Sequence, residues 1–194
     1  MSGQWLFHRS FTVLSLVFII LRPSVLSAAD LQEVYVLSES AVALVQRRHI
    51  QEAVMAAEHA YAICKAELSP EHPWRITCLQ MLAELYRYDE RYDKAEEFYK
   101  QFIQFQNSDL PSGLLDKALA LNNLATIYHE QQQFDKAQFY YNQAFCIYQE
   151  MLGSSHQYTK NCLENINMLN IAMGSETIDA DEIERRIIIT GRNQ

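Results

Sequence analysis

Glycine and proline are scarce in this 194-residue chain, which has only five glycines and four prolines. A many-stranded fold needs more of both residues for its turns, so it is excluded and an all-helical fold is expected. Basic residues are also few, with 16 Lys and Arg against 24 Asp and Glu and a net charge of −8. This acidic balance argues against a nucleic-acid partner. Hydrophobic residues make up 49% of the chain, enough for a folded core.

The motifs of common catalytic sites are missing as well. The sequence has no glycine-rich phosphate loop, no Gly-x-Ser-x-Gly and no Cys-x-x-Cys. His129-Glu130 is the nearest approach to a zinc-protease motif, which requires a second histidine where this chain has Gln133. We therefore expect a protein that is not an enzyme and that has no metal and no cofactor. His72 and His156 begin two equivalent segments, and we expect them to cap helices.

The first 29 residues have the pattern of a secretory signal peptide. Arg9 precedes an 11-residue apolar run from Phe11 to Leu21, whereas a membrane-spanning helix needs roughly 20 residues. Ser27-Ala28-Ala29 offers the small residues that a signal peptidase requires, so we expect cleavage before Asp30. The mature protein is then exported, periplasmic or secreted. The alternative is an uncleaved membrane anchor that keeps the protein facing the extracytoplasmic side.

The rest of the sequence repeats itself every 42 residues. Leu82-Ala83-x-x-Tyr86 matches Leu124-Ala125-x-x-Tyr128, and Tyr92-Asp93-Lys94-Ala95 matches Phe134-Asp135-Lys136-Ala137. A fixed period of this length is typical of stacked helical hairpins. Apolar residues recur at helical spacing within each period, and small alanines lie where two helix backbones approach. The predicted helices cover residues 31–47, 50–68, 73–89, 92–107, 114–131, 134–152 and 157–173.

These motifs resemble the tetratricopeptide repeat, and the period resembles that of the long variant in kinesin light chains. The resemblance implies a right-handed α-α superhelix, or solenoid, of about three helical hairpins within residues 30–174. The repeats are expected at about 35–68, 76–110 and 118–152, with a partial fourth at 160–174. An isoleucine-rich C-terminal segment, residues 175–194, is expected to fold back as a capping helix, because the end of a stack must be covered.

The resemblance also implies where a ligand binds, because the first helices of tetratricopeptide repeats line a concave groove. The transferred contact positions are Thr77, Gln80, Glu84, Arg87, Tyr88, Asn122, Thr126, His129, Glu130 and Glu164. Side-chain amides there could hydrogen-bond the backbone of an extended peptide, while Arg87 and His129 could meet an acidic group. We therefore expect an adaptor or scaffold that binds a protein or extended peptide. A membrane is a partner only if the N-terminal segment is uncleaved.

A second surface offers an alternative function. Phe98, Phe102 and Phe105 follow one predicted helix, and Phe139 and Tyr140 lie at or beside the equivalent positions one repeat later. If these rings form an exposed convex patch, the protein is a self-associating structural subunit and a homo-oligomer.

The four cysteines leave one further question open. Cys64 and Cys78 flank one predicted turn, and Cys146 and Cys162 flank another. After export, each pair could form a disulfide across its hairpin. The alternative is four buried thiols that act as small hydrophobic residues.

Overall fold

The fold is described from a computed structural model, which covers residues 27–106, 111–183 and 185. The long helices of this part of the chain are α2 (Ala28–Gln46), α3 (Ile50–Glu67), α4 (Pro73–Tyr88), α5 (Tyr92–Phe105), α6 (Pro111–Glu130), α7 (Phe134–Leu152) and α8 (Gln157–Ala172). Their bounds agree with the predicted ones to within three residues, and the described residues contain no strand. The all-helical prediction is confirmed.

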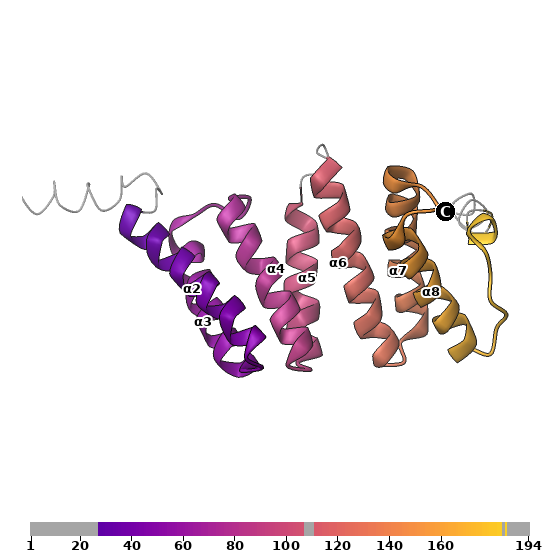
Figure 1. Ribbon diagram of the computed structural model, residues 1–194, viewed down its shortest axis with the longest axis horizontal. Coiled ribbons are helices and arrows are strands. Elements are labelled where there is room, and N and C mark those ends of the chain that lie inside the picture. Colours follow the sequence, from indigo (N-terminus) through magenta and orange to yellow (C-terminus); the bar gives the residue numbers. More distant parts are fainter. Residues whose placement is uncertain (1–26, 107–110, 184, 186–194) are drawn as a thin grey trace, which may run out of the picture.

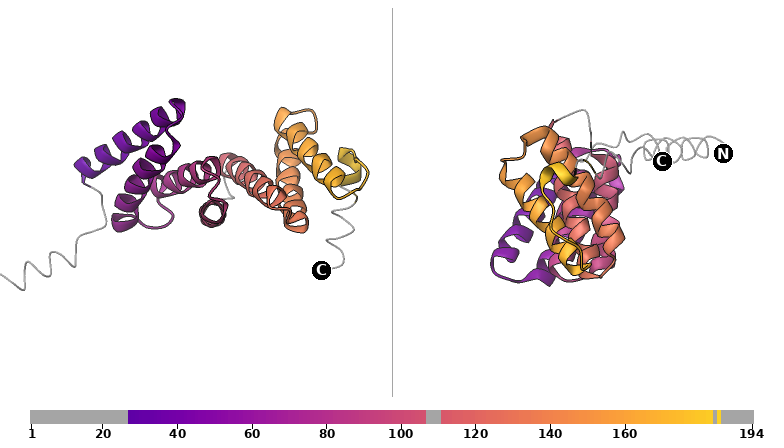
Figure 2. Two further views of the ribbon diagram at one scale, coloured as in Figure 1. Left: turned by 90° about the horizontal axis from the view of Figure 1, so that it is seen from below. Right: turned by 90° about the vertical axis from the view of Figure 1, so that its right-hand side faces the viewer.

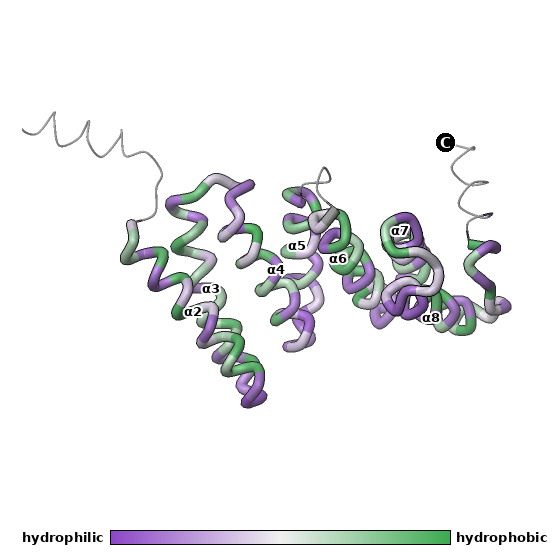
Figure 3. The backbone as a smooth tube through the Cα atoms, turned by 45° about the horizontal axis from the view of Figure 1, so that its top comes forward, coloured by the Kyte–Doolittle hydropathy of each residue, from purple (hydrophilic) through white to green (hydrophobic). Residues whose placement is uncertain are grey.

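The helices form a row of hairpins along the long axis of the molecule (Figure 1). Unit one is α2 and α3, unit two is α4 and α5, unit three is α6 and α7, and α8 begins a fourth unit. The row is curved, and its two ends lie on the same side of the middle helices (Figure 2, left). Hydrophobic and hydrophilic residues alternate along every helix (Figure 3), as expected for helices packed on neighbours within a solenoid.

The helix starts follow local capping chemistry. The Nδ1 atoms of His72 and His156 accept hydrogen bonds from backbone amides two residues later, at 3.3 and 3.2 Å, so their predicted capping role is confirmed. Ser27 caps α2 in a reciprocal arrangement with Asp30, in which each side chain accepts from the other residue's backbone amide.

The hairpin turns share one backbone geometry across all units. In each turn a backbone amide donates back to the end of the first helix, for example Gln133 N–H to the Tyr128 carbonyl at 2.8 Å. One residue per turn has a positive φ, and these residues are spaced by 42: Arg48, Glu90, Gln132 and Gly174. The repeat therefore extends through a fourth turn after α8.

Units two and three are held by the same aromatic stack. In unit two the Tyr86 ring lies between Phe98, at 5.4 Å between centroids, and the Lys94 ammonium, at 5.0 Å from the ring. The equivalent residues of unit three repeat both distances: Tyr128, Tyr140 and Lys136. Such contacts contribute roughly 0.5–1 kcal/mol each beyond area burial.

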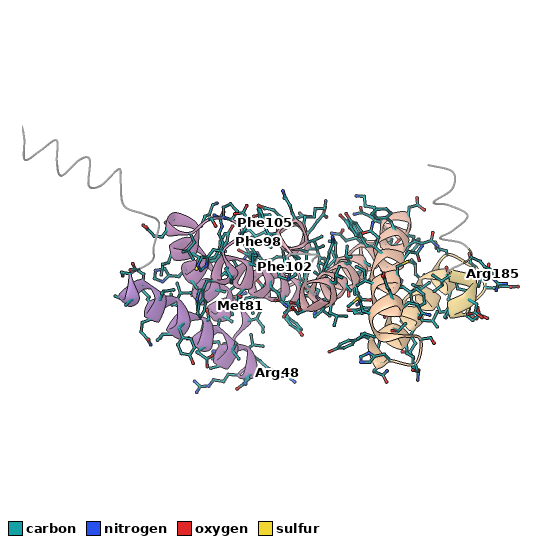
Figure 4. All side chains as sticks on the ribbon, turned by 90° about the horizontal axis from the view of Figure 1, so that it is seen from above. Arg48, Met81, Phe98, Phe102, Phe105 and Arg185 are labelled. Carbon is teal, nitrogen blue, oxygen red and sulfur yellow. The ribbon has the colours of Figure 1, made fainter. Side chains whose placement is uncertain are left out.

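This stack explains why the expected convex aromatic patch is wrong. Phe98 is half-buried between Tyr61 and Tyr86, and Phe102 is only 1% exposed (both labelled in Figure 4). Phe105 and Tyr140 are also partly buried against the core. Phe139, at 55% exposure, is the one ring of the five that is largely accessible. Four of the five rings therefore fill space between helices, and Phe139 alone does not make an external patch.

The fourth unit departs from the repeat at a position that faces the second helix of each hairpin. Units one to three have buried alanines there, namely Ala41, Ala83 and Ala125. Unit four has Asn167, whose amide donates to the Ile178 carbonyl at 2.9 Å and accepts from the Ile178 amide at 2.7 Å. The chain after α8 therefore folds back over it, and Ile183 is 1% exposed. Residues 186–194 of the predicted cap lie outside the described part.

We predict that Asn167→Ala releases this segment. The N–H and the C=O of Ile178 then each lose the hydrogen bond to the Asn167 side chain. The packing of the segment on α8 becomes less stable by about 1–3 kcal/mol. Hydrogen exchange at the Ile178 amide should then accelerate by tenfold or more, while amides of α4 to α6 are unchanged. Asn161→Ala, at an exposed position of the same helix, is the matched control. Slow exchange at Ile178 in Asn167→Ala would contradict the prediction.

Candidate binding groove

The first helices of the units present equivalent positions to one face of the row, which we call the first-helix face. Three sets of positions, spaced by 42 residues through α2, α4, α6 and α8, define it. The sets are Val42, Glu84, Thr126 and Met168; Val45, Arg87, His129 and Ile171; and Gln46, Tyr88, Glu130 and Ala172. The sets contain six of the predicted groove residues together with apolar side chains from α2 and α8: Glu84, Arg87 and Tyr88 on α4, and Thr126, His129 and Glu130 on α6.

A hollow of about 480 Å³ opens between α6 and α8, and its walls combine apolar surface with several hydrogen-bonding groups. We call it the polar hollow because of these groups. It brings together three predicted residues, Thr126, His129 and Glu130, with residues from both neighbouring helices: Gln132, Phe134, Tyr141, Asn165, Met168 and Ala172. Several of its walls are fixed by hydrogen bonds. The Thr126 hydroxyl lies 3.1 Å from the Tyr141 hydroxyl, and the Asn165 amide donates to the Asn122 side-chain oxygen at 3.1 Å.

The edges of this hollow are positioned by aromatic side chains. The His129 ring meets Phe134 edge-on, with 6.0 Å between centroids. Glu130 is exposed and accepts a hydrogen bond from the Tyr92 hydroxyl of the preceding unit, and this bond raises the pKa of Tyr92. Burial raises the pKa of Tyr141 to about 12, so its hydroxyl stays protonated at neutral pH. The hollow therefore offers neutral hydroxyl and amide groups, one imidazole and one carboxylate.

A second hollow, of about 200 Å³, lies between α2 and α4 and is mostly apolar. It contains two predicted residues, Glu84 and Tyr88, among side chains that sequence reasoning did not select: Ala41, Val42, Val45, Gln46, Met81 and Leu85. Val42 and Tyr88 are 48% and 57% exposed, so the hollow is open to a ligand. Figure 4 labels Met81, which lies beside α2.

The polar residues of α4 interact mainly with one another. Gln80 hydrogen-bonds the Glu84 carboxyl, and the Arg87 guanidinium stacks on the Tyr88 ring at 4.7 Å. Burial raises the pKa of the Glu84 carboxyl, although the Gln80 hydrogen bond and the Arg87 charge both act to lower it. Burial also raises the pKa of Tyr99, to about 12, while the nearby charge of Arg87 opposes it. Arg87 is thus partly buried beside Tyr88 and Tyr99, and the expectation that it meets an acidic ligand stays a prediction.

The remaining predicted residues have other surroundings. The Thr77 hydroxyl donates to the Pro73 carbonyl at 3.0 Å within its own helix. Glu164 is exposed, and it is its neighbour Asn165 that bonds Asn122. By repeat position, Glu164 is equivalent to Asn122, which lies 42 residues earlier. The hydrogen bond between the two successive units instead joins Asn122 to Asn165, one residue after the equivalent position. Counting 42 residues back from Glu84 and 42 residues forward from Thr126 identifies Val42 and Met168, two residues of the same face that the sequence analysis did not select.

Metal and membrane chemistry have no counterpart in the described residues. Within residues 27–106, 111–183 and 185, no cluster of three or more His, Cys, Asp or Glu side chains is arranged to hold a metal ion. In the same part of the chain, no helix has the length and apolar character required to span a bilayer.

Comparison with known proteins places the chain in a family. Two models of the tetratricopeptide repeat match it, one over residues 33–108 and the other over residues 118–158. The chain belongs to the tetratricopeptide repeat family. A search of curated proteins finds no match.

Solved structures with this fold include proteins related to kinesin light chains. BtubC (BKLC) from P. vanneervenii is 21% identical, with a TM-score of 0.67 over 81% of this chain and 65% of BtubC. A putative kinesin light chain from Podosopora anserina, with nearly identical TPR-like repeats, is 23% identical and has a TM-score of 0.64 over 90% of this chain and 79% of its own. A variant form of that protein is also 23% identical, with a TM-score of 0.65 over 94% of this chain and 85% of its own. The chain thus shares the fold of kinesin-light-chain-like repeats and spans 65% of BtubC.

We predict that Glu84→Gln stabilises the protein at neutral pH. Because its pKa is raised in the folded state, ionised Glu84 penalises folding once the pH is above that raised value. As the pH falls below the raised pKa, Glu84 becomes protonated in the folded protein and the penalty disappears. The higher melting temperature of Glu84→Gln relative to the wild type should therefore fade at acidic pH. Thermal unfolding across pH 3–8 measures this gain. Glu164→Gln, at an exposed position of α8, should show no such gain; a pH-independent effect of Glu84→Gln would contradict the prediction.

Proposed function

We propose that this protein is an interaction scaffold that binds an extended segment of a partner protein along its first-helix face, without catalysis. The observation that carries the proposal is the pair of hollows on that face at equivalent repeat positions, one almost wholly apolar and the other with hydrogen-bonding groups among apolar walls. Together they can hold two side chains of one bound segment.

The apolar hollow is suited to an anchoring side chain. Val42, Met81 and Tyr88 form walls around the space between α2 and α4. An aliphatic or aromatic side chain that fills it would gain roughly 1.5–3 kcal/mol from burial. This gain is about ten- to 150-fold in affinity, so one seated side chain contributes strongly to binding.

The polar hollow is suited to orienting the same segment. Asn165, His129 and the Thr126 hydroxyl have donors and acceptors that can meet a peptide backbone without selecting its sequence. Glu130 carries a negative charge at its edge, which favours a basic side chain in the partner. The expected ligand is therefore an extended segment with one apolar anchor and a polar or basic residue further along.

The experiment is a selection of peptides from a displayed random library against the full chain. Selected peptides should bind Val42→Asp and Met168→Asp at least tenfold more weakly, because a charge then lies in each binding region of the first-helix face. Met55→Asp is the matched control, since Met55 is as exposed as Met168, at 62%, but belongs to α3, a second helix. Binding that is lost only in Met55→Asp would move the site to the opposite face.

We also propose that the protein acts outside the cytoplasm, after removal of its first 29 residues. The support is the sequence pattern alone, since residues 1–26 lie outside the described part. Cleavage before Asp30 would remove Ser27, the cap of α2, at a cost of about 1 kcal/mol at that helix end. The rest of α2 keeps its contacts with α3.

Mass spectrometry of protein from the native host tests this proposal. The expected mature chain begins at Asp30 and is found in the periplasmic or secreted fraction. Ala29→Arg should block cleavage and leave a longer chain, because signal peptidase requires a small residue there. A wild-type chain that retains residues 1–29 in the membrane fraction would support the anchor instead.

A further inference from the structure

Two buried thiols face each other where unit one meets unit two. Cys64 lies on α3 and Cys78 on α4, their Sγ atoms are 3.9 Å apart, and their exposures are 0% and 1%. Both are free thiols in the structure. We propose that Cys64 and Cys78 are a redox-active pair that forms an intramolecular disulfide and so joins unit one covalently to unit two.

The repeat register distinguishes this pair from Cys146 and Cys162. Cys162 is equivalent to Cys78, 84 residues earlier, but the residue equivalent to Cys64 in unit three is Tyr148. Cys146 is two residues away from that position, on a different side of α7, and is exposed. The buried Cys162 instead has its Sγ 3.5 Å from the Tyr141 carbonyl. Burial, and after it the nearby Cys146, raises the pKa of the Cys162 thiol to about 12, and a disulfide between these two cysteines stays a prediction from the sequence.

The surroundings favour ionisation of one thiol of the pair. The hydrogen bond from Cys78 lowers the pKa of the Cys64 thiol, and the positive charge of Arg75 lowers it further, although burial opposes both. The Arg75 guanidinium is held in place by a 3.0 Å hydrogen bond to the Leu68 carbonyl. Cys64 is thus the thiol that reacts first, since the thiolate is the nucleophile in disulfide exchange.

The oxidant we invoke is a disulfide of the glutathione class. The Cys64 thiolate attacks one sulfur of oxidised glutathione, which breaks its S–S bond, forms a mixed disulfide and releases one glutathione thiolate. The Cys78 thiolate then attacks Cys64 Sγ and releases the second. Two cysteine thiols are oxidised, one glutathione disulfide is reduced to two thiols, and the two cysteine protons pass to the released thiolates. Because both cysteines are buried, the first step requires local opening of α3 against α4.

The Cys64–Cys78 disulfide would affect the relative positions of units one and two as well as the stability of the protein. α3 and α4 are the helices through which unit one packs on unit two, and the apolar hollow lies between α2 and α4 of the same two units. A covalent link restrains how far these units can separate. The closed loop is short, comprising the turn between the two helices and their adjoining ends, so it also restricts the unfolded chain.

The experiment equilibrates the full chain in buffers of varied reduced and oxidised glutathione, then alkylates and digests it with trypsin. Cleavage after Lys65 and Arg75 separates the two cysteines, so a disulfide links peptide 49–65 to peptide 76–87. We expect this linked pair to accumulate as the buffer becomes oxidising. The melting temperature should rise by roughly 6–12 °C at the same time.

Variants separate this result from other oxidation chemistry. Cys78→Ala should show neither the linked peptides nor the rise, while Cys146→Ser should retain both. Should Cys64 and Cys78 remain fully alkylated in the most oxidising buffer, the proposal is overturned. Linked peptides that contain Cys146 or Cys162 in place of the expected pair would overturn it equally. None of these outcomes depends on peptide binding, so the proposed scaffold function is tested separately.

Discussion

Close contact between the two helices of each hairpin is the constraint on which the structure depends, and alanine makes it possible. Ala83 and Ala95 in unit two, and Ala125 and Ala137 in unit three, have no exposed surface. A larger side chain at such a position would push the helix backbones apart, at a cost of about 1–3 kcal/mol. Because units one to three obey this constraint at the same spacing, their first helices align and equivalent side chains share one face.

The end of the stack follows from the loss of the same constraint. Asn167 occupies the position of those alanines in unit four, and an amide there cannot pack against a closely approaching helix. It binds both backbone groups of Ile178, which lies in a non-helical segment, residues 175–179, before a short helical stretch at residues 180–183. The turn at Gly174 has a positive φ like the other hairpin turns, so unit four departs from the repeat only after that turn.

The sequence was sufficient to predict the helices and their order, because the alanine and aromatic positions recur at a constant spacing. It did not reveal the positive φ of Arg48, Glu90 and Gln132, since no glycine marks those turns. Nor did it reveal which polar side chains hydrogen-bond to one another, because a sequence repeat shows which positions are equivalent and not which side chains are in contact. The bond between Asn165 and Asn122 joins residues one position out of register. The aromatic residues were misjudged for a related reason, since Tyr140 has the packing role of Phe98.

The first-helix face therefore offers the proposed partner different surroundings in its middle and toward its ends. In the middle, Gln80, Glu84 and Arg87 are occupied with contacts inside the scaffold. Toward the ends, the equivalent positions change to Val42 on α2 and Met168 on α8, which are open and apolar. Burial of such apolar surface by a ligand is favourable whatever the orientation of the contact. A ligand that displaces the central hydrogen bonds would gain only about as much free energy as is lost by breaking them. Under the proposed function, a partner segment would therefore gain most of its affinity at the two hollows.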